Sequence, residues 1–304
     1  MTVRYARNGV VSVAHEDLGG AGGQPLLLVM GLGVSRFWWP PGLVAELVGR
    51  GFHVVAYDQR DAGQSTHLDP EGGQHPLRTL LRGRSAAYSA EDMADDAVAV
   101  LDVCGWASAH LFGHSMGGLL AQRIALRHPA RVRSVTVSGA VPSDAGPLRV
   151  LQYIRLGFVA RMSRLRFPDG PEGDRAAGLA LARAVASPGY PFDEAAAREA
   201  VERERAAGVR SGVRDPRAQS RQTGAHWSGP RLAQLRAPTV VLHGEDDPLL
   251  RPGAARATAA AIPGARLVTF PGVGHDLPAA LWSRVADEVR AVADGAEGAH
   301  ATRP

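Results

Sequence analysis

The sequence lacks lysine altogether, so all 34 of its basic residues are arginine. It has a single cysteine, Cys104, which excludes an intramolecular disulfide and suits a reducing compartment. No apolar run approaches the length of a membrane span, and the N-terminal segment has no apolar core of signal-peptide length. We therefore expect a cytoplasmic protein without an integral membrane segment.

Features of nucleic-acid and metal sites are also missing. Residues 142–229 hold 14 arginines against 10 acidic residues, and the rest of the chain balances 20 against 20. These arginines are not interleaved with aromatic residues in a recognised nucleic-acid-binding motif, so we expect no nucleic-acid partner. His110 and His114 straddle a predicted strand and turn, and cannot share a helical face as zinc ligands would. We expect no metal and no cofactor, and the oligomeric state stays open.

The most informative feature present is the segment 113–117, which reads Gly-His-Ser-Met-Gly. It follows a strand-like run at 109–112 and precedes a helix-like stretch at 119–125, the setting that gives G-x-S-x-G its meaning. Such a turn exposes its serine, and the positive end of the helix favours the negative charge formed when a carbonyl is attacked. The pattern predicts that Ser115 is a nucleophile. The alternative is a tight βα turn that contains a serine without catalytic use.

A serine nucleophile needs a base and an acid that orients the base, and both should lie downstream in this order. His275 is the candidate base, because it follows the predicted strand 266–270 in a glycine-containing loop before the last helix. The predicted strand 238–244 is followed by three consecutive acidic residues, Glu245, Asp246 and Asp247. We favour Asp247 as the acid because Pro248 stiffens the chain after it, and Asp246 remains the alternative.

A third element is the glycine-rich loop after the apolar run 26–30. Glycines at 31 and 33 allow the backbone to turn its amides inward, so we expect an oxyanion-binding N–H near Leu32. An ordinary βα turn would be the better interpretation if the Ser115 motif were absent.

These segments resemble the α/β-hydrolase superfamily, in particular actinobacterial lipase/esterase-like proteins and anthracycline methylesterases. The resemblance covers nearly the whole chain, at residues 29–33, 57–65, 88–97, 113–118, 191–194, 243–252, 262–267 and 272–278. It implies a Ser115–Asp247–His275 triad and an oxyanion hole made by the N–H groups of Leu32 and Met116. One departure is Met30, because many relatives have histidine there; a hole made of backbone donors survives this change.

Predicted strands and helices alternate from about residue 10 to 140 and from 238 to 292. We therefore expect an α/β-hydrolase fold, with a mostly parallel central sheet flanked by helices, built from residues 1–141 and 230–304. Residues 142–229 have no convincing parallel strand and are expected to form a helical cap inserted over the site. We expect the tail after Asp294 to be frayed.

Five apolar residues of the expected cap are spaced by 3, 4, 4 and 3 positions: Leu151, Ile154, Phe158, Met162 and Leu165. This spacing predicts one amphipathic helix whose arginines lie mostly on other faces. Its apolar face either packs on the core or contacts a membrane surface, or part of it lines the substrate pocket. In the last case Phe158 is a substrate-binding residue.

The expected function is cofactor-independent hydrolysis of a small-molecule carboxylic ester through an acyl-enzyme. Hydrolysis of a thioester, a lactone or a carbon–carbon bond on the same residues is the first alternative. A ligand-binding protein without catalysis is a second, although it would not need all three triad groups. Epoxide hydrolases and haloalkane dehalogenases are disfavoured, because they resemble this fold but place aspartate where Ser115 stands.

Overall fold

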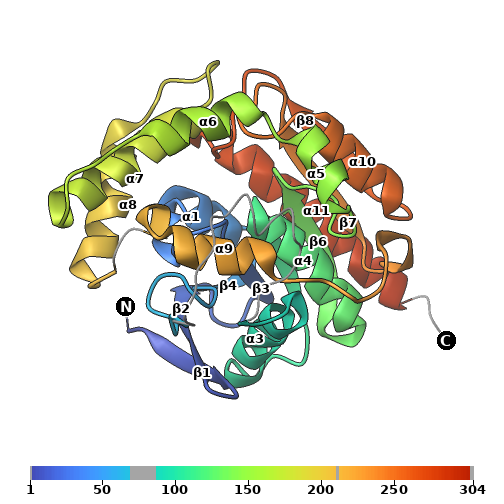
Figure 1. Cartoon of the computed structure of the whole chain (residues 1–304). Helices are drawn as coiled ribbons and strands as arrows, with labels where there is room; N and C mark the ends of the chain where they lie inside the picture. The colour runs from blue at the N-terminus through green and yellow to red at the C-terminus, as the bar shows by residue number, and fades with distance from the viewer. Residues whose placement is uncertain (1, 69–86, 210–211, 302–304) are drawn as a thin grey trace.

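A computed structural model describes residues 2–68, 87–209 and 212–301. Its centre is an eight-stranded sheet in the order β1-β2-β4-β3-β5-β6-β7-β8 (Figure 1). The β1–β2 and β2–β4 pairs are antiparallel and all others are parallel, which confirms the predicted mostly parallel sheet. The strands are β1 (Arg4–Asn8), β2 (Val11–Gly19), β3 (Gln24–Val29), β4 (Phe52–Tyr57), β5 (Ala109–His114), β6 (Val132–Ser138), β7 (Thr239–Gly244) and β8 (Arg266–Phe270).

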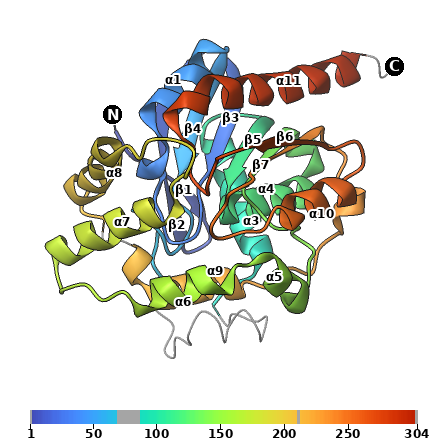
Figure 2. The same ribbon diagram turned by 90° about the horizontal axis from the view of Figure 1, so that it is seen from above.

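Helices cover both faces of the sheet. Figure 2 shows α1 and α11 together on one side and α3, α4 and α10 on the other. These helices are α1 (Pro41–Gly49), α3 (Ala90–Val103), α4 (Met116–Arg127), α10 (Gly253–Ala261) and α11 (Trp282–Ala301). Helices on both sides bury both faces of the sheet. Because the strands are parallel, their carboxyl ends meet at one edge, which is where sites form in such sheets.

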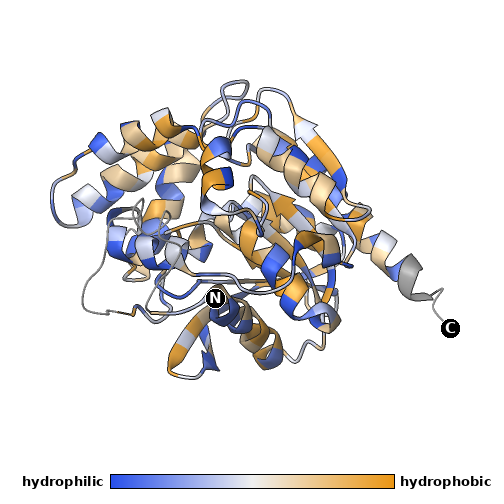
Figure 3. Ribbon diagram, turned by 45° about the vertical axis from the view of Figure 1, so that its right-hand side comes forward, coloured by the Kyte–Doolittle hydropathy of each residue, from blue (hydrophilic) through white to orange (hydrophobic). Residues whose placement is uncertain are grey.

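Strand β3 illustrates why the sheet forms at the centre. Its side chains alternate between two apolar clusters: Leu27 and Val29 pack under α3 and α4, whereas Leu26 and Leu28 pack under α1 and α11. A run of apolar residues without polar alternation is stable only as a strand buried on both faces. Figure 3 accordingly shows apolar strands at the centre and a mixture of polar and apolar residues on the outer helices.

Between β6 and β7, the described residues of the segment 142–229 form helices and 3-10 turns with no named strand. The helices are α5 (Pro147–Tyr153), α6 (Leu156–Arg164), α7 (Pro171–Val185), α8 (Glu194–Ala206) and α9 (Pro216–Gly224). Figure 1 shows α6, α7 and α8 arching over one end of the sheet.

The prediction of one continuous helix through Leu151 and Leu165 is wrong. The chain is extended at Ile154, which forms an isolated antiparallel bridge with Leu250, and the next N–H, of Arg155, donates to the Leu249 carbonyl at 2.8 Å. This long-range backbone pairing interrupts the helix and divides it into α5 and α6.

The expectation of a frayed tail after Asp294 is also wrong, since α11 continues to Ala301. Ala293 and Ala296 are both buried, so the helix keeps its packing past that point. Alanine has the highest helix propensity, which favours continuation of the helix over fraying.

Candidate active site

Ser115 stands at the turn between β5 and α4. Its backbone has φ 56° and ψ −124°, a region that non-glycine residues rarely adopt. The turn is held by a 2.8 Å hydrogen bond from the Ser115 N–H to the Ser138 carbonyl. Glycine is required nearby, because a Cβ on Gly117 would collide with the Val29 carbonyl. The strand-turn-helix arrangement expected from the G-x-S-x-G motif is therefore present, and Ser115 lines a cavity.

The structure brings His275 and Asp247 to Ser115. His275 Nε2 lies 2.9 Å from the Ser115 hydroxyl oxygen, and its Nδ1 lies 2.6 Å from Asp247 Oδ2. The other oxygen of Asp247 accepts the N–H groups of Leu249 and Leu250, both at 2.7 Å. Burial raises the pKa of Asp247, but the His275 charge and these hydrogen bonds outweigh it and hold that pKa below its ordinary value. Asp247 is thus held as a carboxylate that faces the imidazole.

The neighbouring acidic residues do not reach His275. Asp246 is exposed, and its carboxylate accepts the Gly272 N–H at 3.0 Å, which braces the loop before His275. Glu245 is also exposed and accepts the Thr269 hydroxyl at 2.7 Å. Of the three consecutive acids, only Asp247 is buried and directed at the imidazole.

The loop after β3 lies against the Ser115 turn. A Cβ on Gly31 would stand 3.1 Å from the Ser115 Cβ, and both Leu32 and Met116 line the same cavity. Gln222 of α9 fixes this loop by accepting the Gly33 N–H at 3.2 Å. Because Met116 is the first residue of α4, its N–H belongs to the set that has no partner within the helix.

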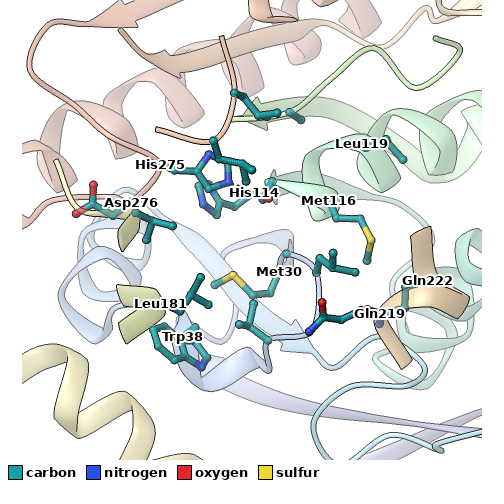
Figure 4. A pocket seen from close by; sticks show the side chains of 18 of the residues that line it. Met30, Trp38, His114, Met116, Leu119, Leu181, Gln219, Gln222, His275 and Asp276 are labelled. Atoms are coloured by element: carbon teal, nitrogen blue, oxygen red, sulfur yellow. Dashed lines mark hydrogen bonds between the residues drawn. The ribbon is translucent and has the colours of Figure 1, made fainter. Parts of the chain in front are cut away.

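A second imidazole stands beside His275. The rings of His114 and His275 lie 5.1 Å apart between centroids (Figure 4). Burial is the main cause that lowers the pKa of His114 to about 3, so this ring is neutral at pH 7. A neutral neighbour lets His275 carry a proton without direct charge repulsion.

Sequence reasoning missed the contacts between residues 142–229, the segment expected to form the cap and called the cap below, and the His275 loop. The His275 N–H donates to the Val185 carbonyl at 2.8 Å, and the Gly274 N–H donates to the Ser187 hydroxyl oxygen at 2.8 Å. The Ser187 hydroxyl in turn hydrogen-bonds the Asp276 carboxylate. No local signal marks Ser187, because its partners are about ninety residues away in the chain.

The cap is also joined to the Asp247 loop. The Arg155 side chain donates to the Asp247 carbonyl at 3.0 Å, and the Arg251 N–H donates to the Tyr153 carbonyl at 2.8 Å. The break between α5 and α6 therefore places cap backbone directly against the acid loop.

A cavity of about 1690 Å³ opens beside Ser115 and His275, lined mainly by apolar side chains. Figure 4 shows side chains from β5, α4, α7, α9 and the loops converging on it: Met30, Trp38, His114, Met116, Leu119, Leu181, Gln219, Gln222, His275 and Asp276. Phe158 of α6 belongs to the same lining and is only 9% exposed. The cavity is large enough for a substrate of drug size.

Within the described ranges, no group of three or more His, Cys, Asp or Glu side chains has an arrangement that could hold a metal ion. None of the helices described is both long and apolar enough to span a membrane.

Comparisons with known proteins identify the family of the chain. The model of the alpha/beta hydrolase fold family matches residues 24–278. The chain is 31% identical to rhodomycin D methylesterase DnrP of Streptomyces peucetius, over 94% of this chain and 96% of that protein. It is 30% identical to the putative carbamate hydrolase RutD of Azorhizobium caulinodans, over 89% of this chain and 91% of that one.

Among solved structures, the esterase RhEst1 of Rhodococcus sp. ECU1013 superimposes with a TM-score of 0.70. It is 23% identical, and the match covers 97% of this chain and 99% of that one. Since the family model covers most of the sequence and the structure has the matching sheet and turn, the chain belongs to the α/β-hydrolase fold family.

Proposed function

We propose that the protein is a cofactor-independent serine hydrolase that cleaves a small-molecule carboxylic ester through an acyl-enzyme. The observation that carries the proposal is the hydrogen-bonded series Ser115–His275–Asp247 at the wall of the cavity. The similarity to a methylesterase over nearly the full length supports an ester as the substrate class.

In the acylation step, the Ser115 oxygen attacks the ester carbonyl while its proton passes to His275 Nε2. Asp247 accepts the hydrogen bond from His275 Nδ1–H, which fixes the tautomer and stabilises the imidazolium. His275 then gives the proton to the alkoxy oxygen of the substrate, the carbon–oxygen bond breaks, and the alcohol leaves. Water, deprotonated by the same ring, hydrolyses the acyl–Ser115 ester and releases the acid.

The oxyanion of the tetrahedral intermediate is assigned to two backbone donors, the N–H groups of Leu32 and Met116. The close approach of Gly31 to Ser115 and the position of Met116 at the start of α4 support this assignment. Donors held by the backbone need no reorganisation during the reaction, so they favour the transition state over the planar ester.

We further assign residues 1–141 and 230–304 to a catalytic core and residues 142–229 to a cap that shapes the substrate cavity. Phe158 is the cap residue assigned to substrate binding, because it is buried and lines the cavity. On this proposal, changes in the cap alter substrate choice and changes in the core alter the chemistry.

Covalent labelling tests the proposal directly. A fluorophosphonate probe should modify the protein at Ser115, and Ser115→Ala should abolish labelling and lower ester hydrolysis on the order of 10³-fold or more. Ser108→Ala is the matched control, because the Ser108 hydroxyl accepts a hydrogen bond from Arg133 at 2.8 Å and Ser108 does not belong to the cavity lining. Circular dichroism should show all three proteins equally folded.

A panel of acyl and methyl esters, thioesters, lactones and carbamates then defines the bond that is cleaved. Labelling at Ser115 with turnover of thioesters or lactones but not esters would keep the mechanism and change the substrate class. Retention of labelling in Ser115→Ala would overturn the proposal, and absence of both labelling and turnover would favour a binding protein.

A further inference from the structure

Arg123 of α4 is a charged residue of the cavity wall that the proposed reaction does not use. It lies eight residues after Ser115, which is about 12 Å along the helix axis. Side chains on a helix lean towards its N-terminus, so the Arg123 side chain leaves the backbone on the side of Ser115. Leu119, one turn closer to Ser115, lines the same cavity (Figure 4).

The guanidinium of Arg123 has few partners among the described residues. Its Nη2 donates to the Ser143 carbonyl at 3.2 Å, and its Nε is shielded from solvent without any acceptor. The Trp227 ring lies 5.7 Å away. The described part of the chain shows no ion pair for Arg123, whereas Arg127, one turn further along α4, pairs with Asp95.

One described carboxylate acts on the charge of Arg123 and another lines the same cavity, and each accepts hydrogen bonds from other groups. Glu91 is the acid whose charge acts on Arg123, but it accepts the N–H and the hydroxyl of Ser228 at 2.7 and 2.8 Å. Asp144 also lines the cavity, and its carboxylate accepts the Leu232 N–H at 3.2 Å. Among the described residues, no carboxylate lies within ion-pair distance of the Arg123 guanidinium, and Arg123 belongs to the cavity wall.

Burial lowers the pKa of Arg123 to about 10, which leaves the side chain charged at neutral pH. A cation held in this way is costly unless an anion compensates it, and guanidinium binds carboxylates through parallel N–H donors. An anion from the substrate is the simplest compensation, because the cavity connects Arg123 with the reacting serine.

We propose that Arg123 forms a subsite for a carboxylate carried by the substrate at a distance from the ester bond. The Trp227 ring beside the guanidinium provides an apolar wall for the chain or ring that carries the carboxylate. This inference rests on the proposed ester hydrolysis, and it narrows the substrate class to esters with a remote carboxylate.

The test compares two series of p-nitrophenyl esters: monoesters of linear dicarboxylic acids, and the same compounds with the free carboxylate capped as a methyl ester. In the wild-type protein, the kcat/KM ratio of free to capped substrate should exceed one and peak at a particular chain length. Arg123→Gln should lower that ratio about 10- to 100-fold, mostly through KM. Arg127→Gln removes a positive charge outside the cavity lining, and it should change the kcat/KM ratio of free to capped substrate less than about twofold.

A binding measurement separates the subsite from the chemistry. Tryptophan fluorescence of Ser115→Ala titrated with monomethyl suberate should show saturable binding that weakens by a similar factor in Ser115→Ala/Arg123→Gln. If wild type turns over no ester and takes no fluorophosphonate label, the proposed function fails, while this titration still reports on Arg123.

Two results would overturn the subsite. One is a wild-type ratio near one at every chain length, and the other is an equal effect of the Arg123 and Arg127 substitutions. Arg123→Met keeps the apolar stem against Trp227 and replaces the glutamine variant if that variant does not fold. It should give the same loss of carboxylate preference.

Discussion

The central sheet and the cap are held together by different forces. Strands β3, β5 and β7 are buried over nearly their whole length. In the cap, α5 buries no residue and α6 buries only Phe158, while the buried residues of α7 are all alanine or glycine. Burial of large apolar side chains stabilises the sheet, whereas the cap has little apolar area to bury against the core.

The cap compensates with polar contacts, and several of them reach the loops that carry the reacting groups. Arg155 contacts the Asp247 loop, Ser187 contacts the His275 loop, and Arg221 pairs with buried Asp61. On the proposed function, these contacts link the cap to the loops of Asp247 and His275. The following substitutions test that division between a rigid core and a coupled cap.

The largest effect is expected in the core, at the acid. Asp247→Asn should lower kcat about 10⁴-fold, because the amide holds the imidazole in the wrong tautomer. Asp246→Asn, one residue earlier and exposed, should change kcat less than about twofold. Hydrolysis of p-nitrophenyl acetate by both variants measures the difference. If the order were reversed, the acid would have to be reassigned to Asp246.

The second-largest effect is expected on stability, at the ion pair between Arg221 of the cap and Asp61 of the core. Arg221 of α9 donates to both oxygens of Asp61 at 2.8 and 2.7 Å, and Asp61 is fully buried. Arg221→Met should lower the free energy of unfolding by about 3 kcal/mol, because it leaves a buried carboxylate without its cation. Urea denaturation checks this value.

Two controls accompany the Arg221 measurement. Arg205→Met removes an exposed cap arginine that pairs with Glu202, and it should leave the stability unchanged within error. The double variant Arg221→Met/Asp61→Asn should recover about half of the loss, since no unpaired charge remains buried. Equal losses in the single and double variants would show that packing, and not charge, makes the contribution.

The contrast between the two regions also explains what the sequence could predict. The core strands follow from runs such as Phe52–Tyr57, and the turn at Ser115 follows from glycines needed for close backbone approach. Both signals are local. Ser115 and His275 could be named from local motifs and from the chain order of the family that the sequence resembles, whereas the choice between Asp247 and Asp246 needed their contacts.

The cap could not be predicted in the same way. The apolar spacing from Leu151 to Leu165 favours one helix, but backbone pairing of Ile154 and Arg155 with residues 249–250 interrupts it. Ser187 carries no motif, and its importance comes from partners in the His275 loop. Contacts between residues about ninety positions apart leave no periodic trace in the sequence, so tertiary structure decides them.

A moderate effect is expected where cap and core are coupled. Ser187→Ala removes the hydroxyl that joins the Gly274 N–H to the Asp276 carboxylate, which should loosen the loop that holds His275. We expect kcat to fall about tenfold with little change in KM, because one or two hydrogen bonds of about 1 kcal/mol are lost.

The conservative variant Ser187→Thr keeps the hydroxyl and should restore most of kcat. If Ser187→Ala lowers the melting temperature but not kcat, Ser187 stabilises the cap and does not position His275. The kcat and KM values of all three proteins, with melting temperatures measured in parallel, distinguish these outcomes.

The smallest effect is expected inside the cap, at Phe158. Phe158→Ala should lower kcat/KM for a long-chain or aromatic ester by about 3- to 8-fold more than for a minimal acetate ester, because only the larger substrate reaches α6. Leu156→Ala is the matched control, since Leu156 lies on the same helix but is 55% exposed and outside the cavity lining. It should leave the ratio between the two substrates unchanged. Equal losses on both substrates in Phe158→Ala would assign this side chain to cap stability, and unchanged values would place α6 outside the path of the substrate. A larger loss on the larger substrate would assign substrate choice to the cap.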